Sequence, residues 1–559
     1  MDTELHNAIS ANDLEAVTRL VKAGASINKL HGMKGTPLCA AIASNKIDIV
    51  RYFIQQEECD VNLADFDGEP PLCLAISKNR TDIAKVLIDF RGCNLNVEDP
   101  IQKKTALCIA ICEGNREIVE YLLKAGCNVN KISAHGTPPV HYAVTDSRLD
   151  LVELLVNNGV SLLDCNNCGH NALHHSIYHE DVKCTELLLH LIEKDEGKKR
   201  IVDSTTVIRN DSCLHIAVDV GSVVLTEMLL QFQSNINILN NLGHSPLFAA
   251  VRNNSTDLVS CLLKGGADPG IEGAENVRGH YQTRPRKLSA LHVAVSNGNL
   301  DIVKLLVENG TRINVVDFRG NNALMVALHH NKANIAKYLL ESSKIDVLMR
   351  NHMNENCLFA AISCADPAWF VRELVKRGCS VNQRNSENLT PLHLAVDNDC
   401  TEVTDVLLEN GGDVNALTNE DYTHLHTCAS AGYTDIIRLL LLYGANIDAE
   451  NEDKQTPLAV AIDCENYETA AILLDCGASS RWVLSEYQSV ANLIREKIQD
   501  EEWEETLTRL LQENLSVPKL QLICRRSVTR YFAKKKLSLK NIPLLPVPTR
   551  TIQYLNFRC

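Results

Sequence analysis

The chain has 559 residues and a mass of 61.9 kDa, a length that ordinarily corresponds to about three to five domains. Hydrophobic residues make up 45% and charged residues 22%, which is typical of a globular protein and excludes a mostly disordered chain. The formal net charge of −15 argues against nucleic-acid binding by the chain as a whole. The charge is uneven, however, because the chain after Glu513 contains ten Lys or Arg and no Asp or Glu.

The sequence carries signals about its cellular compartment. The first residues lack the basic region and apolar stretch of a secretory signal, and the longest apolar run, near residues 439–442, is far too short to cross a bilayer. We therefore expect the protein in the cytoplasm, with the nucleus as a further location. In a reducing compartment the 21 cysteines are expected to be mostly free thiols.

An internal repeat runs from the first residues of the chain. A leucine or similar residue marks the start of each expected first helix from Leu5 to Leu458, and eleven of the thirteen successive gaps are 33–35 residues long. The clearest copy, at residues 390–395, reads T-P-L-H-L-A. Its Thr can cap the helix and its Pro suits the first helical position. A second helix follows, as at residues 301–306, and ends at a glycine such as Gly310, which can adopt the left-handed C-cap conformation.

This unit resembles the ankyrin repeat, whose period is 33 residues and whose signature is T-P-L-H-x-A. The resemblance implies an all-α repeat fold, an ankyrin-repeat solenoid of about fourteen repeats over residues 1–480, because one unit cannot bury its apolar face alone. One array then replaces the several domains expected from length. The two longest gaps, of 41 and 44 residues, predict loops near residues 193–211 and 270–287, and a partner contact and a neutral insertion are both open for each loop.

One group of residues has a spacing similar to that of a zinc site: Cys165, Cys168, His170 and Cys184. Its first two cysteines fall in the hairpin that every repeat possesses, so the sequence favours a repeat that is merely rich in Cys and His. No metal site is therefore predicted.

The sequence contains no catalytic signature: no Gly-rich phosphate loop, no G-x-S-x-G and no H-E-x-x-H. Several histidines share one position of the repeat, and a position that recurs argues for a structural role. We therefore predict neither enzymatic activity nor a cofactor. The recurring histidines are His6, His215, His292, His393 and His426.

The repeat pattern stops near residue 480. Residues 481–517 are predicted to be a helical cap or linker, because Trp503, Leu507 and Leu511 fall on one helical face. The end of a repeat array needs such a cover with a polar outer surface.

The last segment, residues 518–559, resembles a SOCS box, and the whole chain is therefore similar to the ankyrin repeat and SOCS box protein family. The first part of that module, the BC box, has an L-x-x-x-C-x-x-x-Φ pattern, and the second part has L-P-Φ-P. The two patterns occur here in the family's order. The matching residues are Leu520, Ile523, Cys524 and Val528 in the BC box, and Leu545, Pro546, Val547 and Pro548 in the second part.

The resemblance implies specific partners. In the family, the apolar stripe of the BC-box helix enters a groove on Elongin C, which associates with Elongin B. The L-P-Φ-P stretch faces a cullin scaffold of the cullin-five type, which carries a RING subunit. The predicted function is therefore a non-catalytic substrate receptor of a ubiquitin ligase, with an unidentified target protein held by the ankyrin repeats.

Two other functions remain open at the level of sequence. The chain could be an ankyrin scaffold with no ligase role, or its basic tail could bind nucleic acid, with Tyr531 and Phe532 stacking on bases. The apolar stripe and the L-P-V-P stretch have no role in nucleic-acid binding, so the sequence favours the docking module.

Overall fold

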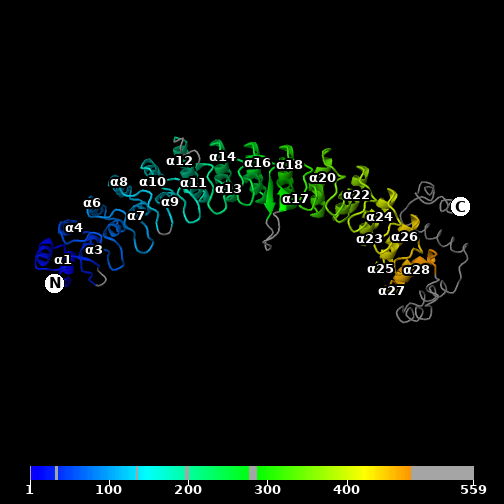
Figure 1. Cartoon of the computed structure of the whole chain (residues 1–559), viewed down its shortest axis with the longest axis horizontal. Helices are drawn as coiled ribbons and strands as arrows, with labels where there is room; N and C mark the ends of the chain where they lie inside the picture. The colour runs from blue at the N-terminus through cyan, green and yellow to red at the C-terminus, as the bar shows by residue number, and fades with distance from the viewer. Residues whose placement is uncertain (1, 32–34, 134–135, 195–200, 276–285, 480–559) are drawn as a thin grey trace. The chain divides into compact units, whose positions relative to one another are not determined.

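The computed structural model describes residues 2–31, 35–133, 136–194, 201–275 and 286–479. The chain divides into two compact units, Met1–Pro285 with Glu308–Gly310 and Arg286–Val307 with Thr311–Cys559. In each unit, successive pairs of antiparallel helices lie side by side, and a hairpin-like connector joins each pair to the next (Figure 1).

The first unit consists of eight helix pairs and one short strand in its described residues. Odd-numbered helices are the first of each pair and even-numbered helices the second. The elements are α1 (Asp2–Ser10), α2 (Leu14–Lys22), α3 (Pro37–Ala43), α4 (Ile47–Ile54), α5 (Pro71–Ser77), α6 (Thr81–Asp89), α7 (Ala106–Glu113), α8 (Arg116–Lys124), α9 (Pro139–Thr145), α10 (Leu149–Asn157), α11 (Ala172–Tyr178), α12 (Val182–Glu193), α13 (Cys213–Asp219), α14 (Val223–Gln231), α15 (Pro246–Arg252), α16 (Thr256–Lys264) and β1 (Glu272–Glu275).

The second unit continues the same pattern. Its described elements are β2 (Arg286–Ser289), α17 (Ala290–Asn297), α18 (Leu300–Glu308), α19 (Ala323–His329), α20 (Ala333–Glu341), α21 (Cys357–Ile362), α22 (Pro367–Lys376), α23 (Pro391–Asp397), α24 (Thr401–Glu409), α25 (His424–Ala431), α26 (Thr434–Leu442), α27 (Pro457–Asp463) and α28 (Tyr467–Asp475).

Local sequence explains where these helices begin and end. The first helices are capped by a Ser, Thr or Asn side chain in most repeats; at α3, for example, the Thr36 hydroxyl accepts the backbone N–H of Cys39. The turn between the helices of a pair requires a left-handed residue, and Asn45 supplies it with φ 57°. After the second helix, glycines such as Gly310, with φ 88°, adopt the same left-handed conformation.

The core is a row of first helices, each packed on its own second helix and on the first helices of adjacent repeats, as α3, α5 and α7 show. The leucines that define the repeat in the sequence are buried: Leu38, Leu72 and Leu107 are each 1% exposed. The all-helical repeat architecture is therefore confirmed within each unit. Stacking is required because a single helix pair leaves its apolar face uncovered.

Both long gaps carry regular structure where they are described. In the first gap, α12 has 12 residues, against 9 in a typical second helix such as α10. The second gap contains β1 and β2, which the repeat pattern did not predict. In the described part of the chain, no helix combines the length and the apolar character needed to span a membrane.

Candidate protein-binding surfaces

The recurring histidine joins one repeat to the next. The ring of His215, at the third position of α13, accepts the backbone N–H of Ser212 at Nδ1 (3.2 Å), and its Nε2 donates to the carbonyl oxygen of His244 (2.9 Å). Burial lowers the pKa of His215 and keeps the ring neutral, as this pairing requires. His292 and His426 donate in the same way to carbonyl oxygens 29 residues further along the chain. At these three positions the recurring histidine therefore has a structural role.

A second inter-repeat connection lies in the connectors. The Asn62 side chain accepts the backbone N–H of Asn94 (2.8 Å) and donates to the carbonyl oxygen of Gly92 (2.8 Å), both in the next connector. We call this set of contacts the asparagine ladder. Side chains that accept an N–H in this way are Asn28, Asn62, Asn96, Asn130, Asp203, Asn237, Asn314, Asn382, Asn415 and Asp448.

In three repeats, the position that corresponds to Asn62 holds a residue whose side chain has no hydrogen-bond acceptor. These residues are Leu163, Gly270 and Leu348. Leu163 and Leu348 are each 58% exposed. Leu163 precedes the first long gap in the repeat and Gly270 lies within the second, so both long gaps coincide with an interruption of the ladder.

The exposed turn of each connector, here called the connector tip, carries different side chains along the chain. In the first unit the connector tips present apolar side chains to solvent, for example Phe66 (62% exposed), Ile101 (79%) and Ile208 (66%). Large apolar side chains that remain exposed in a folded protein commonly mark protein–protein contact sites. These tips therefore form a candidate binding surface of the first unit.

The last repeats of the second unit carry a different surface. Residues 384–479 contain eighteen Asp or Glu and three Lys or Arg, a formal charge of −15. At the connector tips, Glu387 and Glu420 lie five residues after Asn382 and Asn415, the positions that Asp67 and Ile101 occupy in the first unit. This segment favours basic over acidic partners.

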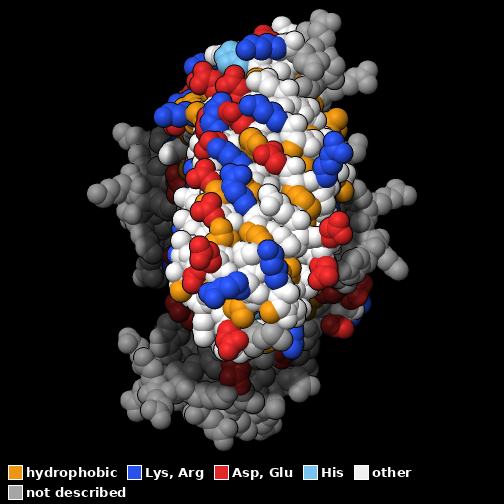
Figure 2. Space-filling view, turned by 90° about the vertical axis from the view of Figure 1, so that its left-hand side faces the viewer, with side chains coloured by type: hydrophobic (Ala, Val, Ile, Leu, Met, Phe, Trp, Pro, Cys, Tyr) orange, Lys and Arg blue, Asp and Glu red, His pale blue; other side chains and the backbone are white. Residues whose placement is uncertain are grey.

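The face of the first unit that is visible from its N-terminal end has a mixed composition. Figure 2 views the chain from its N-terminal end and shows basic and acidic side chains interspersed with smaller apolar areas. A surface of this kind gives specificity through local pairing rather than through a field of one sign.

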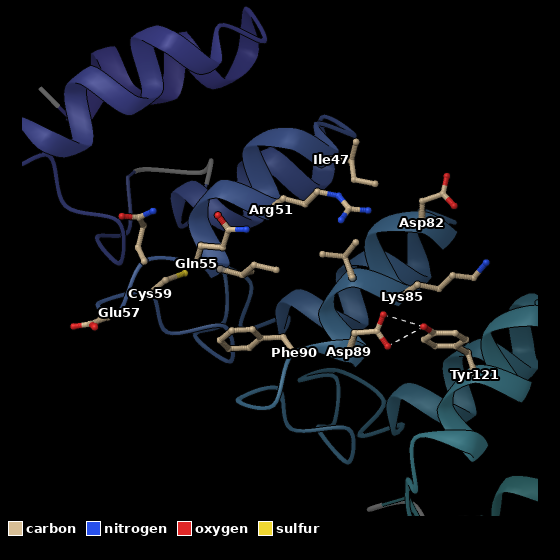
Figure 3. Close-up of a pocket in the computed structure, with 13 residues that line it drawn as sticks. Ile47, Arg51, Gln55, Glu57, Cys59, Asp82, Lys85, Asp89, Phe90 and Tyr121 are labelled. Carbon is tan, nitrogen blue, oxygen red and sulfur yellow. Dashed lines mark hydrogen bonds between the residues drawn. The ribbon is translucent and has the colours of Figure 1, made fainter.

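A groove of about 760 Å³ lies between α4 and α6 and reaches α8 (Figure 3). The connectors after α4 and α6 are each sixteen residues long, two more than those after α8 and α10. Neither α4 nor α6 is followed by the left-handed glycine that ends most second helices, so the chain leaves the helix by a wider turn. The lining residues are Ile47, Arg51, Ile54, Gln55, Gln56, Glu57, Cys59, Asp82, Lys85, Val86, Asp89, Phe90 and Tyr121.

Comparison with known proteins identifies the repeat. The sequence matches the family described as "Ankyrin repeats (3 copies)" over residues 5–99, 57–133, 90–166, 107–198, 191–273, 275–351 and 410–481, and the family described as "Ankyrin repeats (many copies)" over residues 374–428. The chain belongs to the ankyrin repeat family. Ankyrin repeats are protein-interaction modules, so the exposed tips and the groove are candidate contact surfaces for protein partners.

Individual ankyrin-repeat relatives are distant. The chain is 28% identical over 250 residues to ankyrin repeat protein nuc-2 of Neurospora crassa, covering 44% of this chain and 22% of that protein. It is 31% identical over 233 residues to the B-cell lymphoma 3 protein homolog of Mus musculus (40% and 48%). It is 25% identical over 312 residues to the E3 ubiquitin-protein ligase KEG of Arabidopsis thaliana (48% and 18%). The chain thus spans less than half the length of each of these relatives.

The residues with zinc-like spacing are dispersed over one ankyrin repeat. Cys184 lies in the core of α12, where burial raises its pKa to about 12, and Cys168 is exposed in the preceding connector. Cys165 Sγ donates to the carbonyl oxygen of Leu163 (3.4 Å), and His170 is half-buried. Among the residues that the structure describes, no group of three or more His, Cys, Asp or Glu is arranged to hold a metal ion.

The predicted docking module lies outside the described residues, as does the predicted cap. The residues concerned are Leu520, Ile523, Cys524 and Val528 of the BC box and Leu545, Pro546, Val547 and Pro548 of the second motif. The predicted boundaries at 480 and 517 remain predictions for the same reason.

The asparagine ladder and the groove were not predicted from the sequence. The ladder had a detectable signal, since an Asn or Asp recurs four or five residues before the exposed connector tip in most ankyrin repeats. The groove had a weaker signal, the lack of a glycine two residues after Ile54, where α8 and α10 are followed by Gly126 and Gly159.

Proposed function

We propose that this ankyrin-repeat chain is a non-catalytic substrate receptor of an Elongin B/C–cullin–RING ubiquitin ligase. The observation that carries the proposal is the order of three sequence features: ankyrin repeats, then the BC-box pattern at Leu520–Val528, then Leu545–Pro548. Two relatives of low identity, KEG and the probable E3 ubiquitin-protein ligase XBOS33 of Oryza sativa, are named ubiquitin ligases and give general support.

In this proposal, the ankyrin repeats and the C-terminal module have different roles. The ankyrin repeats bind a target protein through exposed side chains such as Phe66 and Ile101. The C-terminal module binds the ligase core. Ubiquitin transfer is then accelerated by proximity and orientation, because the recruited RING subunit and its conjugating enzyme perform the chemistry.

The BC-box spacing has a physical rationale. Leu520, Cys524 and Val528 are four residues apart, which is the spacing that places side chains on one face of a helix. A narrow apolar stripe of this kind is stable only when a partner covers it, and insertion into a groove on Elongin C provides that cover.

Capture of the purified partner tests the Elongin contact. We expect the double variant Leu520→Ala with Cys524→Ala to lose Elongin B/C from a pull-down, because it removes two anchors of the stripe. Gln521→Ala, on another face of the same helix, is the matched control and should retain Elongin B/C. If the double variant retains undiminished Elongin B/C, the BC-box assignment is wrong.

A second variant separates the cullin contact from the Elongin contact. Pro546→Ala with Pro548→Ala frees the backbone of the L-P-V-P stretch and should weaken capture of the cullin–RING pair while leaving Elongin B/C bound. A wild-type chain that captures Elongin B/C but no cullin would limit the function to Elongin binding. A chain that captures neither is an ankyrin scaffold with no ligase role.

A further inference from the structure

The groove between α4 and α6 combines an apolar floor with charged walls. Ile54 is 9% exposed, and Val86 and Phe90 are half-buried beside it. The volume of about 760 Å³ lies within the usual range for ligand-binding pockets in proteins, about 300–1,000 Å³. The groove is formed by second helices and by the connector after α4, so it is separate from the exposed connector tips.

Two of the five charged residues that line the groove, Lys85 and Asp89, are already engaged in contacts. Lys85 Nζ donates to a carboxylate oxygen of Glu117, and this contact raises the pKa of Lys85. The Tyr121 hydroxyl lies 2.8 Å and 2.9 Å from the two carboxylate oxygens of Asp89 (Figure 3), which raises the pKa of Tyr121. These contacts bridge α6 and α8 and hold that wall in place.

Arg51 is different. Its guanidinium extends from α4 toward α6 (Figure 3) and makes no hydrogen bond or ion pair with the residues that the structure describes. A guanidinium presents its N–H groups in a planar fork that matches a carboxylate. Glu57 points away from this region of the groove, and Asp82 lies on the opposite wall. The side of the groove formed by α4 is therefore positive, and the side formed by α6 disfavours a second acid.

We propose that this groove binds a short segment of a partner protein that carries a large apolar side chain next to an acidic residue. The apolar side chain packs on Val86 and Phe90, and the acidic side chain pairs with Arg51. The proposal does not depend on the ligase function, because it uses neither the C-terminal module nor the connector tips.

Fluorescence anisotropy with a labelled synthetic peptide tests this proposal on the full-length chain. The probe is fluorescein-Gly-Ser-Gly-Asp-Leu-Phe-Gly-Ser-amide. Two matched peptides replace either its Asp with Lys or its Leu-Phe pair with Ser-Ser. We expect saturable binding of the probe, with a loss of affinity of at least tenfold for each matched peptide.

Variants of the chain locate the binding site. Arg51→Glu should lower the affinity for the probe at least tenfold. It should also restore binding of the peptide in which Lys replaces Asp, because the charges are then reversed together. The matched control is Arg438→Glu, which changes an arginine at the corresponding position of α26 and should leave affinity unchanged.

Three results would overturn the proposal: a wild-type chain that does not bind the probe, equal binding of probe and Lys peptide, or equal loss in Arg51→Glu and Arg438→Glu. Because Arg51 is exposed, its replacement should leave the fold intact, and an unchanged far-UV circular dichroism spectrum would verify this.

Discussion

Replacement of Asn62 by Ala tests the asparagine ladder. The change removes one side chain that accepts the N–H of Asn94 and donates to the carbonyl oxygen of Gly92, each at 2.8 Å. Both partners belong to the connector of the next repeat. The two hydrogen bonds contribute ~0.5–1.5 kcal/mol each, and water replaces part of this at an exposed site. We therefore expect a loss of about 1–2 kcal/mol in the free energy of local opening.

Hydrogen exchange measures this loss directly. The backbone N–H of Asn94 should exchange about 5- to 30-fold faster in Asn62→Ala, the factor that corresponds to 1–2 kcal/mol. Asn62→Asp keeps the acceptor for Asn94 but loses the bond to Gly92, so its effect should be intermediate. Unfolding by urea is a poorer assay, since long repeat arrays do not unfold in one cooperative step.

The matched control is Asn158→Ala. The Asn158 side chain donates only to the carbonyl oxygen of Leu154 in its own repeat (2.8 Å), so its loss should change stability by less than about 0.5 kcal/mol. Unaltered exchange at Asn94 in Asn62→Ala would show that the ladder contributes nothing between these repeats.

Three further outcomes follow from the structure. His215→Ala should destabilise its repeat by about 2 kcal/mol or more, because the buried carbonyl of His244 loses its donor; unaltered hydrogen exchange at the backbone N–H groups of α13 would contradict this. Burial lowers the pKa of His141 and of His174 to about 4, below the unfolded value of ~6.5, so their stabilising effect is complete above pH 6.5. The stability of their repeats should then decline as the pH falls from 6.5 toward 4. Protection of the α9 and α11 backbone N–H groups from hydrogen exchange, corrected for the intrinsic pH dependence of exchange, should fall with it, and constant protection over this interval would refute the assignment. Iodoacetamide at neutral pH should modify the exposed Cys168 before the buried cysteines of the first helices, whose pKa values burial raises; mass spectrometry of digested protein identifies the order.

Much of the fold was predictable because the repeat makes each element appear many times. Leu38 and its equivalents define the period of the repeat, which stays recognisable when the sequence of one repeat departs from the pattern. The glycines after the second helices, such as Gly310, mark where each helix pair ends. The structure confirms both, with Leu38 buried and Gly310 in the left-handed conformation. The structural role predicted for the recurring histidines is confirmed at His215, His292 and His426.

The unpredicted features depend on departures from the repeat. The groove arises where two connectors lack the glycine turn, and an apolar floor such as Val86 looks like ordinary helix packing in the sequence. The strand β1 lies within an insertion that has no counterpart in other repeats. The ladder escaped notice because its bonds run from a side chain to a backbone group 32 residues away, as from Asn62 to Asn94.

The interruptions of the ladder divide the chain into blocks of repeats. The bonded series from Asn28 ends at Ser161, and a new series begins at Asp203. Leu163 lies between them, so the insertion that separates these two repeats interrupts no bond of the ladder. During evolution, residues can therefore be inserted or deleted where the ladder is interrupted, at little cost in stability. An insertion between Asn62 and Asn94, in contrast, would break the ladder.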